Sequence, residues 1–349
     1  MKFFNLSLHI SIVADIKNIF EKLNHQVDNW SISNHSHLMG WKRKDDCVIN
    51  QFNFQNLDQK MCDDFYEKYK KELSQYDGFI CDHTPAFSLL YEKFNKPIIV
   101  MASTRYEHPF SSDITKWMWL NRYLRSGIEN GKIIPIANNK YDAEYFKTFV
   151  GKECEVIPSL CAYTKAKWTG KEEKYIYSSK INLQLPNSSH MLVKEDELSS
   201  GYKWQALADY RGIVHIPYNG SVMSISEQYT SNIPLIFPSL DFLMDLMKSR
   251  AMSEVSYNQI FGLPSRSIIP VLNDPNNFKD RENMKHWFSL SDFYDSKNMP
   301  FITYFNSFED LENRLETIDA EDISGKMKKH NRKRKKEIIQ KWKDVLEKI

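Results

Sequence analysis

Residues 215–238 read HIPYNGSVMSISEQYTSNIPLIFP, and this stretch decides the fold of the chain. The run Gly212–Tyr218 is apolar and typical of a strand, and it breaks at Asn219-Gly220-Ser221. A segment of helical character follows and carries a single carboxylate, Glu227, ahead of a second strand-like run, Pro234–Phe237. Strand, helix and strand in this order predict a βαβ unit, whose strands pair in parallel.

The same alternation extends along both halves of the chain and lapses into a polar linker at residues 160–174. We therefore expect two α/β domains, an N-terminal one at 1–160 and a second at 175–320, followed by a basic helix at 321–349. The predicted strands are 3–8, 26–32, 79–81, 98–102, 133–137, 155–157, 175–177, 191–193, 212–218, 234–237 and 302–305. The predicted helices are 12–23, 57–74, 85–94, 113–125, 141–149, 202–210, 241–250 and 309–318, and residues 254–280 have no clear periodicity.

The composition is that of an ordinary globular protein, with 42% hydrophobic and 26% charged residues. A formal net charge of +2 gives no strong positive field, so we expect no nucleic-acid partner. The five cysteines form no C-x-x-C pair, which argues against a disulfide framework or a zinc site. We find no signal-peptide pattern and no run of about 18 apolar residues, so we expect a cytoplasmic protein.

Polar residues follow the predicted strands of the first half. Right-handed crossovers place the carboxyl ends of parallel strands at one edge of a sheet, and ligands bind in the crevice there. The residues just after each strand are therefore candidates for a site, and several of them could move a proton. They include His9, His83, Arg105 and Glu107.

The loop Asn219-Gly220-Ser221 lies at the same kind of edge in the second domain. The first N–H groups of a helix are unpaired and partly positive, and a loop of small residues lets a phosphate approach them. Glu227, about two turns into the helix, could accept hydrogen bonds from a vicinal diol such as a ribose. Alternatively, Ser221 only caps the helix and Glu227 is an exposed helix residue. Neither a G-x-G-x-x-G fingerprint nor a Walker A loop is present.

The segment Glu227–Ile236, E-Q-Y-T-S-N-I-P-L-I, resembles the donor-site segment E-A-x-x-x-G-x-P-[VIL]-[IVL] of glycosyltransferases with the GT-B fold. Asn232 stands where the family has its turn glycine, and asparagine also tolerates a left-handed turn. Leu23–Val27 is similar to the family's L-x-x-G-H-x-V. The resemblance implies two Rossmann-like domains facing a cleft and transfer of a sugar from a nucleotide-sugar to an acceptor hydroxyl, by a hexosyl- or pentosyltransferase.

The resemblance also implies roles for single residues in the donor site. Glu227 would bind the donor ribose, and the loop of Asn219, Gly220 and Ser221 would contact the diphosphate or the sugar. Lys180, with Ser178 and Ser179 beside it, would supply positive charge or donors to the leaving diphosphate. Retaining members often carry E-x7-E, and Asn219 replaces the first of these glutamates here, which favours an inverting reaction.

An inverting transferase needs a general base on the acceptor hydroxyl. In many relatives a histidine of the first strand–helix loop does this, so His9 is our first candidate and Asp15 our second; the alternative for His9 is a structural loop histidine. His83 and Glu107 are further options. Arg105 could reach across the cleft, bind the acceptor or form a salt bridge with Glu107.

Nothing in the sequence requires a metal or another cofactor, because no D-x-D motif ends a predicted strand. The expected partners are thus a nucleotide-sugar donor and a glycan or other hydroxyl acceptor. Two alternatives stay open. The chain could be a nucleotide-sugar epimerase of the same two-domain type, or a non-catalytic binding protein that docks through its C-terminal helix.

The C-terminal segment is basic and amphipathic. Residues 326–336, KMKKHNRKRKK, contain eight Lys or Arg and no acid, and apolar residues from Ile338 to Ile349 recur on one helical face. Such a helix can lie on an anionic membrane or touch phosphates. Alternatively, its apolar side packs on the body of the protein and its lysines are solvated.

Overall fold

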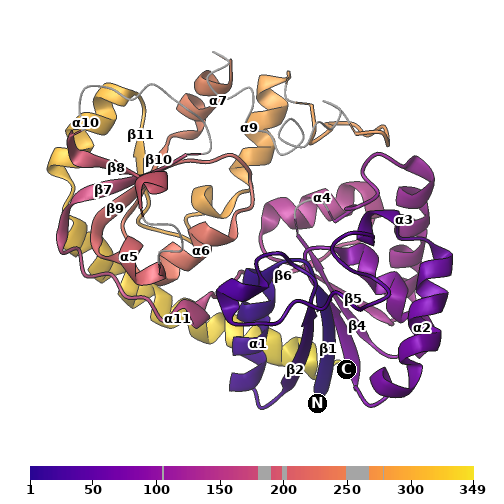
Figure 1. The fold of residues 1–349 in the computed structure, drawn as a ribbon. Coiled ribbons are helices and arrows are strands. Elements are labelled where there is room, and N and C mark those ends of the chain that lie inside the picture. Colours follow the sequence, from indigo (N-terminus) through magenta and orange to yellow (C-terminus); the bar gives the residue numbers. More distant parts are fainter. Residues whose placement is uncertain (104–105, 180–189, 199–202, 249–266, 278) are drawn as a thin grey trace. The chain divides into compact units, whose positions relative to one another are not determined.

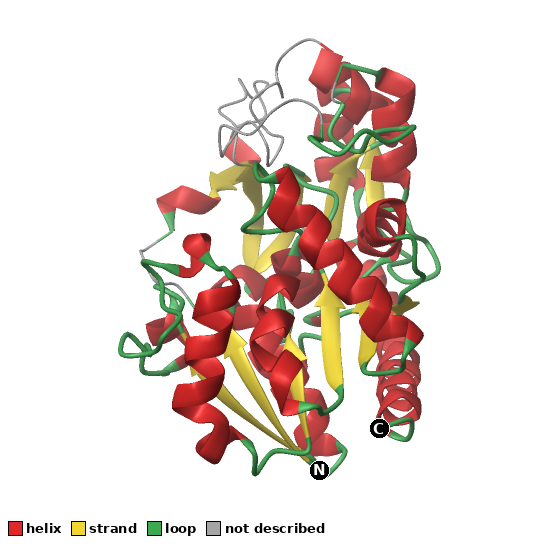
Figure 2. Ribbon diagram, turned by 90° about the vertical axis from the view of Figure 1, so that its right-hand side faces the viewer, coloured by secondary structure: helices red, strands yellow, loops and turns green. Residues whose placement is uncertain are grey.

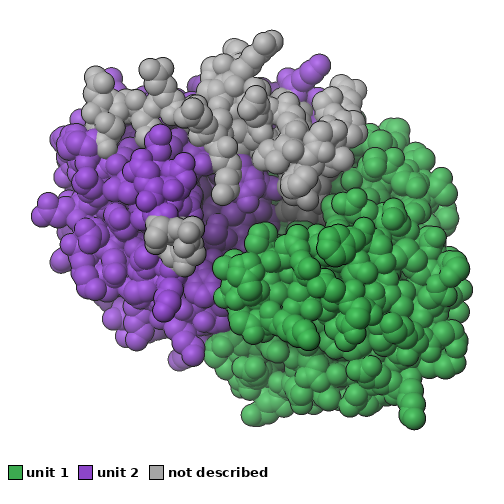
Figure 3. Space-filling model, viewed as in Figure 1, with its two compact units in different colours: residues 1–159, 267–272, 338–349 green, residues 160–266, 273–337 purple. Residues whose placement is uncertain are grey.

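The computed structural model describes residues 1–103, 106–179, 190–198, 203–248, 267–277 and 279–349. The chain forms two compact units (Figure 3). Unit 1 comprises residues 1–159, 267–272 and 338–349, and unit 2 comprises residues 160–266 and 273–337. Each unit has its own parallel sheet, six-stranded in unit 1 and five-stranded in unit 2, with helices around it (Figures 1 and 2). The prediction of two Rossmann-like α/β domains is confirmed.

Unit 1 contains a parallel sheet of order β2-β1-β3-β4-β5-β6. Its strands are β1 (Lys2–Ser7), β2 (Gln26–Ser31), β3 (Gly78–Cys81), β4 (Ile98–Ala102), β5 (Ile133–Ala137) and β6 (Glu155–Val156). Its α-helices are α1 (Ile10–Lys22), α2 (Gln59–Leu73), α3 (Ile114–Glu129) and α4 (Lys140–Val150), and its 3-10 helices are η1 (Ser36–Met39), η2 (Phe54–Asn56) and η3 (Pro85–Phe94). Helix α1 lies on one side of the sheet and α2, α3 and α4 on the other (Figure 1).

The η3 segment corrects one prediction, because residues 85–94 were expected to form an α-helix. Pro85 opens the segment and the side chain of Thr84 gives it no cap. Most of its side chains are buried, and it packs on α2, β3 and β4. An α-helix at a surface usually has a polar face, and this segment has none along most of its length. Packing on several sides therefore favours the more tightly wound 3-10 helix.

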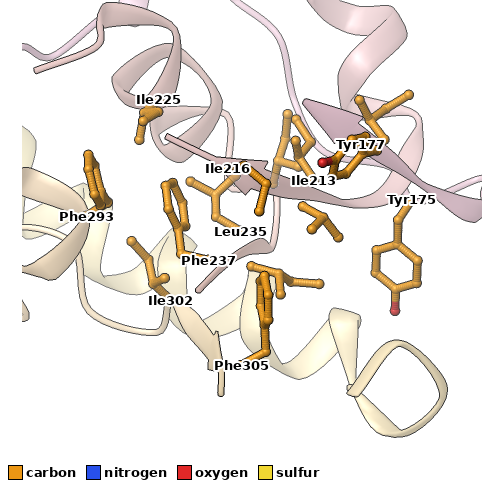
Figure 4. Close-up of a cluster of buried hydrophobic side chains, with 14 of the residues drawn as sticks. Tyr175, Tyr177, Ile213, Ile216, Ile225, Leu235, Phe237, Phe293, Ile302 and Phe305 are labelled. Carbon is orange, nitrogen blue, oxygen red and sulfur yellow. The ribbon is translucent and has the colours of Figure 1, made fainter. Parts of the chain in front are cut away.

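Unit 2 contains a parallel sheet of order β11-β10-β9-β7-β8. Its strands are β7 (Glu172–Ser179), β8 (Leu192–Lys194), β9 (Tyr210–Ile216), β10 (Leu235–Pro238) and β11 (Thr303–Phe305). Its helices are η4 (Ala162–Thr164), η6 (Glu195–Glu197), α5 (Trp204–Ala208), α6 (Met223–Thr230), α7 (Leu240–Lys248), α9 (Arg281–Ser289), η7 (Asp292–Tyr294) and α10 (Phe308–Thr317). Side chains from β7, β9, β10 and β11 meet in one buried core, among them Tyr175, Ile213, Leu235, Phe237 and Phe305 (Figure 4).

Residues 160–174, expected as a linker, are packed on unit 2. The Trp168 N–H donates to the carbonyl of Ser231 (2.9 Å), and the Thr169 N–H donates to that of Ala208 (2.9 Å). Strand β7 then begins at Glu172, three residues before the predicted strand. Of the stretch 254–280, residues 254–266 and 278 lie outside the described residues.

The C-terminal helix α11 (Ala320–Leu346) is continuous over 27 residues. Its first part belongs to unit 2, and its residues from Ile338 onward belong to unit 1. There Trp342, 2% exposed, packs edge-on against Phe20 of α1 at 5.3 Å between ring centroids. Across the described parts of the chain, no helix combines the length and the apolar character that a membrane span requires.

Candidate active site

Each sheet has a point at which the strand order reverses. In unit 2, β7 is followed along the chain by β8 on one side and then by β9 on the other, so the reversal lies between β7 and β9. In unit 1 it lies between β1 and β3, because β2 flanks β1 on the opposite side. In open α/β sheets such switch points leave a crevice at the carboxyl ends of the strands, and ligands bind in it.

A cavity of about 190 Å³ occupies the switch point of unit 2. Ser178 and Ser179, at the end of β7, line this cavity, and both are among the residues predicted to bind the donor. Lys180, predicted beside them, lies outside the described residues. The remaining wall comes from the end of β9, the start of α6 and η6, namely His215, Ile216, Pro217, Tyr218, Val222, Ser224, Ile225 and Glu195.

Helix α6 begins next to the cavity. Its N-cap residue is Val222, so the alternative in which Ser221 caps the helix is wrong. The Ser221 N–H instead turns toward the Asn219 side chain, with 3.4 Å between the nitrogen and Oδ1. Residues 219–221, with Gly220 buried at their centre, thus form the predicted loop between strand and helix. The first amides of α6 keep the partial positive charge of a helix N-terminus beside the cavity.

The cavity wall also contains a carboxylate and a neutral imidazole. The Ser178 hydroxyl donates to Oε2 of Glu195 at 2.5 Å. His215, 5% exposed, stacks on Phe237, and its Nε2 lies 2.6 Å from Oε1 of Gln228, to which it donates. Burial lowers the pKa of His215 to about 4, so the ring is neutral at neutral pH. Hydroxyls, a carboxylate and a neutral ring suit a ligand rich in hydroxyl groups.

Glu227 is buried, with only 7% of its surface exposed, which contradicts the alternative of an exposed helix residue. The Tyr163 hydroxyl donates to its Oε1. The indole N–H of Trp204 donates to its Oε2 at 3.0 Å. Tyr163 and Trp204 are half-buried and meet edge to face at 5.6 Å. The carboxylate therefore sits against an aromatic pair that fixes its orientation.

The switch point of unit 1 holds two stacked imidazoles. His9 follows β1 and His83 follows β3, and their ring centroids are 4.9 Å apart with 25° between the planes. Burial, together with the smaller effect of the neighbouring His35, lowers the pKa of His9 to about 4. Burial also holds the pKa of His83 well below its usual value, with His9 and His108 adding to the effect. Both rings are therefore neutral near neutral pH.

Asp82 directly precedes His83 in the chain and is fully buried. The Asn5 amide nitrogen donates to its Oδ1 (3.2 Å) and to the carbonyl of Ile80 (2.8 Å), which ties β1 to β3. Burial raises the pKa of Asp82 to about 7. In this apolar setting, burying a carboxyl group that is neutral for much of the time costs less free energy than burying a permanently charged carboxylate.

Four adjacent strands, β2, β1, β3 and β4, are each followed by a histidine, in the order His35, His9, His83 and His108. Around them lie buried polar atoms for which the described residues offer no hydrogen-bond partner. These are Asn5 Oδ1, Ser7 Oγ, His9 Nδ1, Asp82 Oδ2, His83 Nδ1, Thr84 Oγ1 and Ser103 Oγ. Such concentrations of unsatisfied groups call for water or a ligand.

No protein-family model matches the chain, and no curated protein matches it. Among solved structures, a glycotransferase of kitacinnamycin is similar to this chain with 9% sequence identity and a TM-score of 0.47. The match covers 100% of this chain and 99% of that protein. The spinosyn forosaminyltransferase SpnP matches with 12% identity, 90% and 98% covered, and a TM-score of 0.39. S. aureus MnaA, in a co-structure with UDP, matches with 11% identity, 90% and 94% covered, and a TM-score of 0.41. These similarities are distant.

Two other predicted residues differ from their expected setting. Asp15 was expected at the start of a helix, but it is buried more than a turn inside α1, which begins at Ile10. Glu107 is fully buried, and the Tyr145 hydroxyl donates to its Oε1 at 2.8 Å. Arg105 lies outside the described residues. His9 and His83 are the predicted candidates of unit 1 that the fold brings together.

Several site residues were not predicted. Tyr163 and Trp204 precede Glu227 by 64 and 23 positions, and Glu195 belongs to the acidic run 195–197, which looks like an ordinary solvated turn. His215 was hidden within a strand-like run. Its position at the carboxyl end of β9 could have indicated it, because the same rule selected His9. The described residues contain no cluster of ligands that could hold a metal ion.

Proposed function

We propose that this chain is a glycosyltransferase that moves a sugar from a nucleotide-sugar donor to an acceptor hydroxyl. The observation that carries the proposal is the cavity at the switch point of unit 2, beside the N-terminal end of the helix that bears Glu227. A nucleotide-sugar has three parts, a diol, a diphosphate and a polyhydroxyl ring. The site has a chemical counterpart for each.

Glu227 is proposed to bind the donor ribose. In the free protein its Oε1 already accepts from a hydroxyl, that of Tyr163, and a ribose hydroxyl is a donor of the same kind. The indole of Trp204 holds Oε2 in place and offers an aromatic surface next to the ribose position. Nucleobases stack favourably on such surfaces.

The diphosphate is proposed to lie against the first amides of α6 and the loop of Asn219, Gly220 and Ser221, with Lys180 as a further contact. Backbone N–H groups at a helix N-terminus stabilise the charge of a leaving diphosphate without a metal. Ser178, Ser179, Glu195 and His215 would then meet the hydroxyl groups of the sugar. This assignment keeps the Glu195 carboxylate away from the phosphates, which it would repel.

His9 is proposed as the general base, with His83 stacked beside it and the unsatisfied polar atoms of unit 1 around the acceptor. The acceptor oxygen forms a bond to the anomeric carbon while its proton passes to Nδ1 of His9. The bond from that carbon to the diphosphate oxygen breaks, and the diphosphate leaves with the electron pair. A single displacement of this kind inverts the anomeric configuration. The polar atoms of unit 1 would bind and orient the acceptor.

A ligand screen tests the donor class. UDP-, GDP-, CMP- and dTDP-sugars are added singly, and the melting temperature is measured. A ligand that binds only the folded state at a hundredfold excess over its Kd stabilises by about 2.7 kcal/mol, so the correct donor should give a clear upward shift. The donor that binds is then incubated with and without candidate acceptors. Its conversion to an epimer without an acceptor, or the absence of any stabilising donor, would overturn the proposal.

A ligand pair tests the role of Glu227. Glu227→Gln should weaken binding of the matching nucleoside diphosphate roughly 10- to 150-fold, since a hydrogen bond to a charged group contributes about 1.5–3 kcal/mol. The 2′,3′-dideoxy nucleotide should lose far less, because it lacks the diol. Tyr163→Phe is the matched control, since it removes the internal donor but keeps the carboxylate. Equal losses for both nucleotides would exclude a contact between Glu227 and the ribose.

A further inference from the structure

Helix α11 has a buried face that is fully occupied by the protein itself. Met327 and Ile338 are 0% and 2% exposed. The Asn331 amide donates to the carbonyl of Tyr229 (2.9 Å), and the Arg334 guanidinium, although basic, turns inward and donates to Asn298 Oδ1 (2.8 Å). The apolar side of this amphipathic helix therefore cannot insert into another medium without unpacking.

The opposite face is cationic and open. An α-helix has about 3.6 residues per turn and rises about 1.5 Å per residue. Five exposed basic residues therefore lie within an arc of about 120° around the axis of α11 and within about 12 Å along it. Lys326 and Lys333 are compensated by Asp322 and Glu337 one turn away. The five residues within the arc form no ion pair with any described residue. They are Lys328, Lys329, Arg332, Lys335 and Lys336.

The positive charge of the chain is concentrated in this segment of α11, and the rest of the chain has a net negative charge. Residues 326–336 carry eight positive charges and no negative one, and the whole chain has a formal net charge of +2. The remainder therefore has +2 − 8 = −6. The molecule thus combines one short positive strip with a net negative body, which orients it in front of an anionic surface.

We propose that the cationic face of α11, residues Lys328, Lys329, Arg332, Lys335 and Lys336, docks the protein on an anionic lipid surface. A lipid surface presents many anionic head groups side by side, so the five cations of the strip can meet negative charge together. A nucleic acid is less favoured, because the chain as a whole has a formal net charge of only +2. Because the apolar face is already packed, attachment is purely electrostatic and reversible by salt.

Vesicle flotation of the full chain tests this proposal. The wild-type protein should bind vesicles of phosphatidylcholine and phosphatidylglycerol at low ionic strength and should not bind phosphatidylcholine alone. Each cation near such a surface contributes about a fivefold factor, so Lys328→Gln, Arg332→Gln and Lys335→Gln together should lower the partition coefficient about 100-fold. High salt should release the wild-type protein completely.

The control removes the same charge elsewhere, by Lys42→Gln, Lys71→Gln and Lys279→Gln at three exposed lysines. This control should bind nearly as the wild type does. Equal losses for the two triple variants, salt-resistant binding, or no preference for the anionic vesicles would each overturn the proposal. So would tighter binding to a DNA duplex than to the anionic vesicles in the same buffer. None of these readouts depends on enzymatic activity, so the proposal stands apart from the proposed function.

Discussion

At the scale of single residues, His9 meets a second imidazole and not a carboxylate. A carboxylate beside a histidine raises its basicity, whereas burial and then the nearby His35 disfavour a positive charge on His9. The base is therefore weak, but it is unprotonated over the whole physiological range. This setting gives the proposed reaction an unusual pH dependence.

Replacing His9 by Ala should lower kcat by a factor on the order of 10² to 10⁴ while donor affinity persists. In the wild type the acid limb of kcat/KM should lie near pH 4 instead of near 6.5, because His9 becomes protonated only below its lowered pKa. Steady-state rates across this pH range measure both effects.

His35→Ala is the matched control for His9. It removes a neighbouring charge without touching the proposed base, so the acid limb should move upward in pH while kcat at pH 7 is kept. Undiminished turnover in His9→Ala would remove this residue from the mechanism and leave Asp15 to be tested next.

Glu227 has a structural role as well as a proposed binding role. Its carboxylate satisfies the Tyr163 hydroxyl and the Trp204 indole from within a buried position. Glu227→Ala should therefore lower the free energy of unfolding by about 2 kcal/mol, the order expected for lost hydrogen bonds to a charged group. Urea unfolding measures this value. A loss below about 0.5 kcal/mol, typical of surface substitutions, would contradict the buried setting.

At the scale of elements, the turn between α6 and β10 depends on Asn232. Its backbone is left-handed (φ 64°), as the predicted replacement of a turn glycine requires, and its side chain accepts from Asn331 of α11 (2.9 Å). A β-branched residue is strained in this conformation. Asn232→Val should therefore be less stable than Asn232→Gly by about 2 kcal/mol in urea unfolding. Equal stability of the two variants would show that the turn relaxes.

The elements could be predicted from the sequence to the extent that their own periodicity determines them. Predicted strands such as 98–102 and 133–137 match β4 and β5, and the loop before α6 was located from three small polar residues. The strand order could not be predicted, because parallel pairing joins residues far apart in the chain. Without the order, neither the switch point that brings His83 next to His9 nor the one beside His215 could be located. The winding of η3 was missed for a similar reason, since packing partners set it.

At the scale of the whole molecule, buried histidines make stability depend on pH. In the unfolded chain His215 has its usual pKa near 6.5, and in the folded protein its pKa is about 4. The unfolded state therefore binds the proton more readily, so the contribution of His215 to stability is complete above pH 6.5 and is lost as pH falls toward 4. Between pH 7.5 and 5 the loss should be about 2 kcal/mol.

His215→Gln isolates this effect, because glutamine does not titrate and can still donate to Gln228. The free energy of unfolding of the variant should fall about 2 kcal/mol less than that of the wild type between pH 7.5 and 5. The comparison is needed because Asp82, whose pKa is raised to about 7, stabilises the folded state as pH falls and so acts in the opposite direction. Parallel pH curves for the two proteins would refute the buried neutral imidazole.

The end of α11 has a consequence for how the protein is made. Unit 1 draws its sheet from residues 1–159 but one of its helical segments from residues 338–349, beyond the whole of unit 2. On the ribosome, the strands of unit 1 emerge before those of unit 2, yet Phe20 lacks its partner Trp342 until the end of α11 has been synthesised. Unit 1 is thus completed only after unit 2 has been synthesised, and a chain that lacks the end of α11 exposes an apolar surface that a chaperone would recognise.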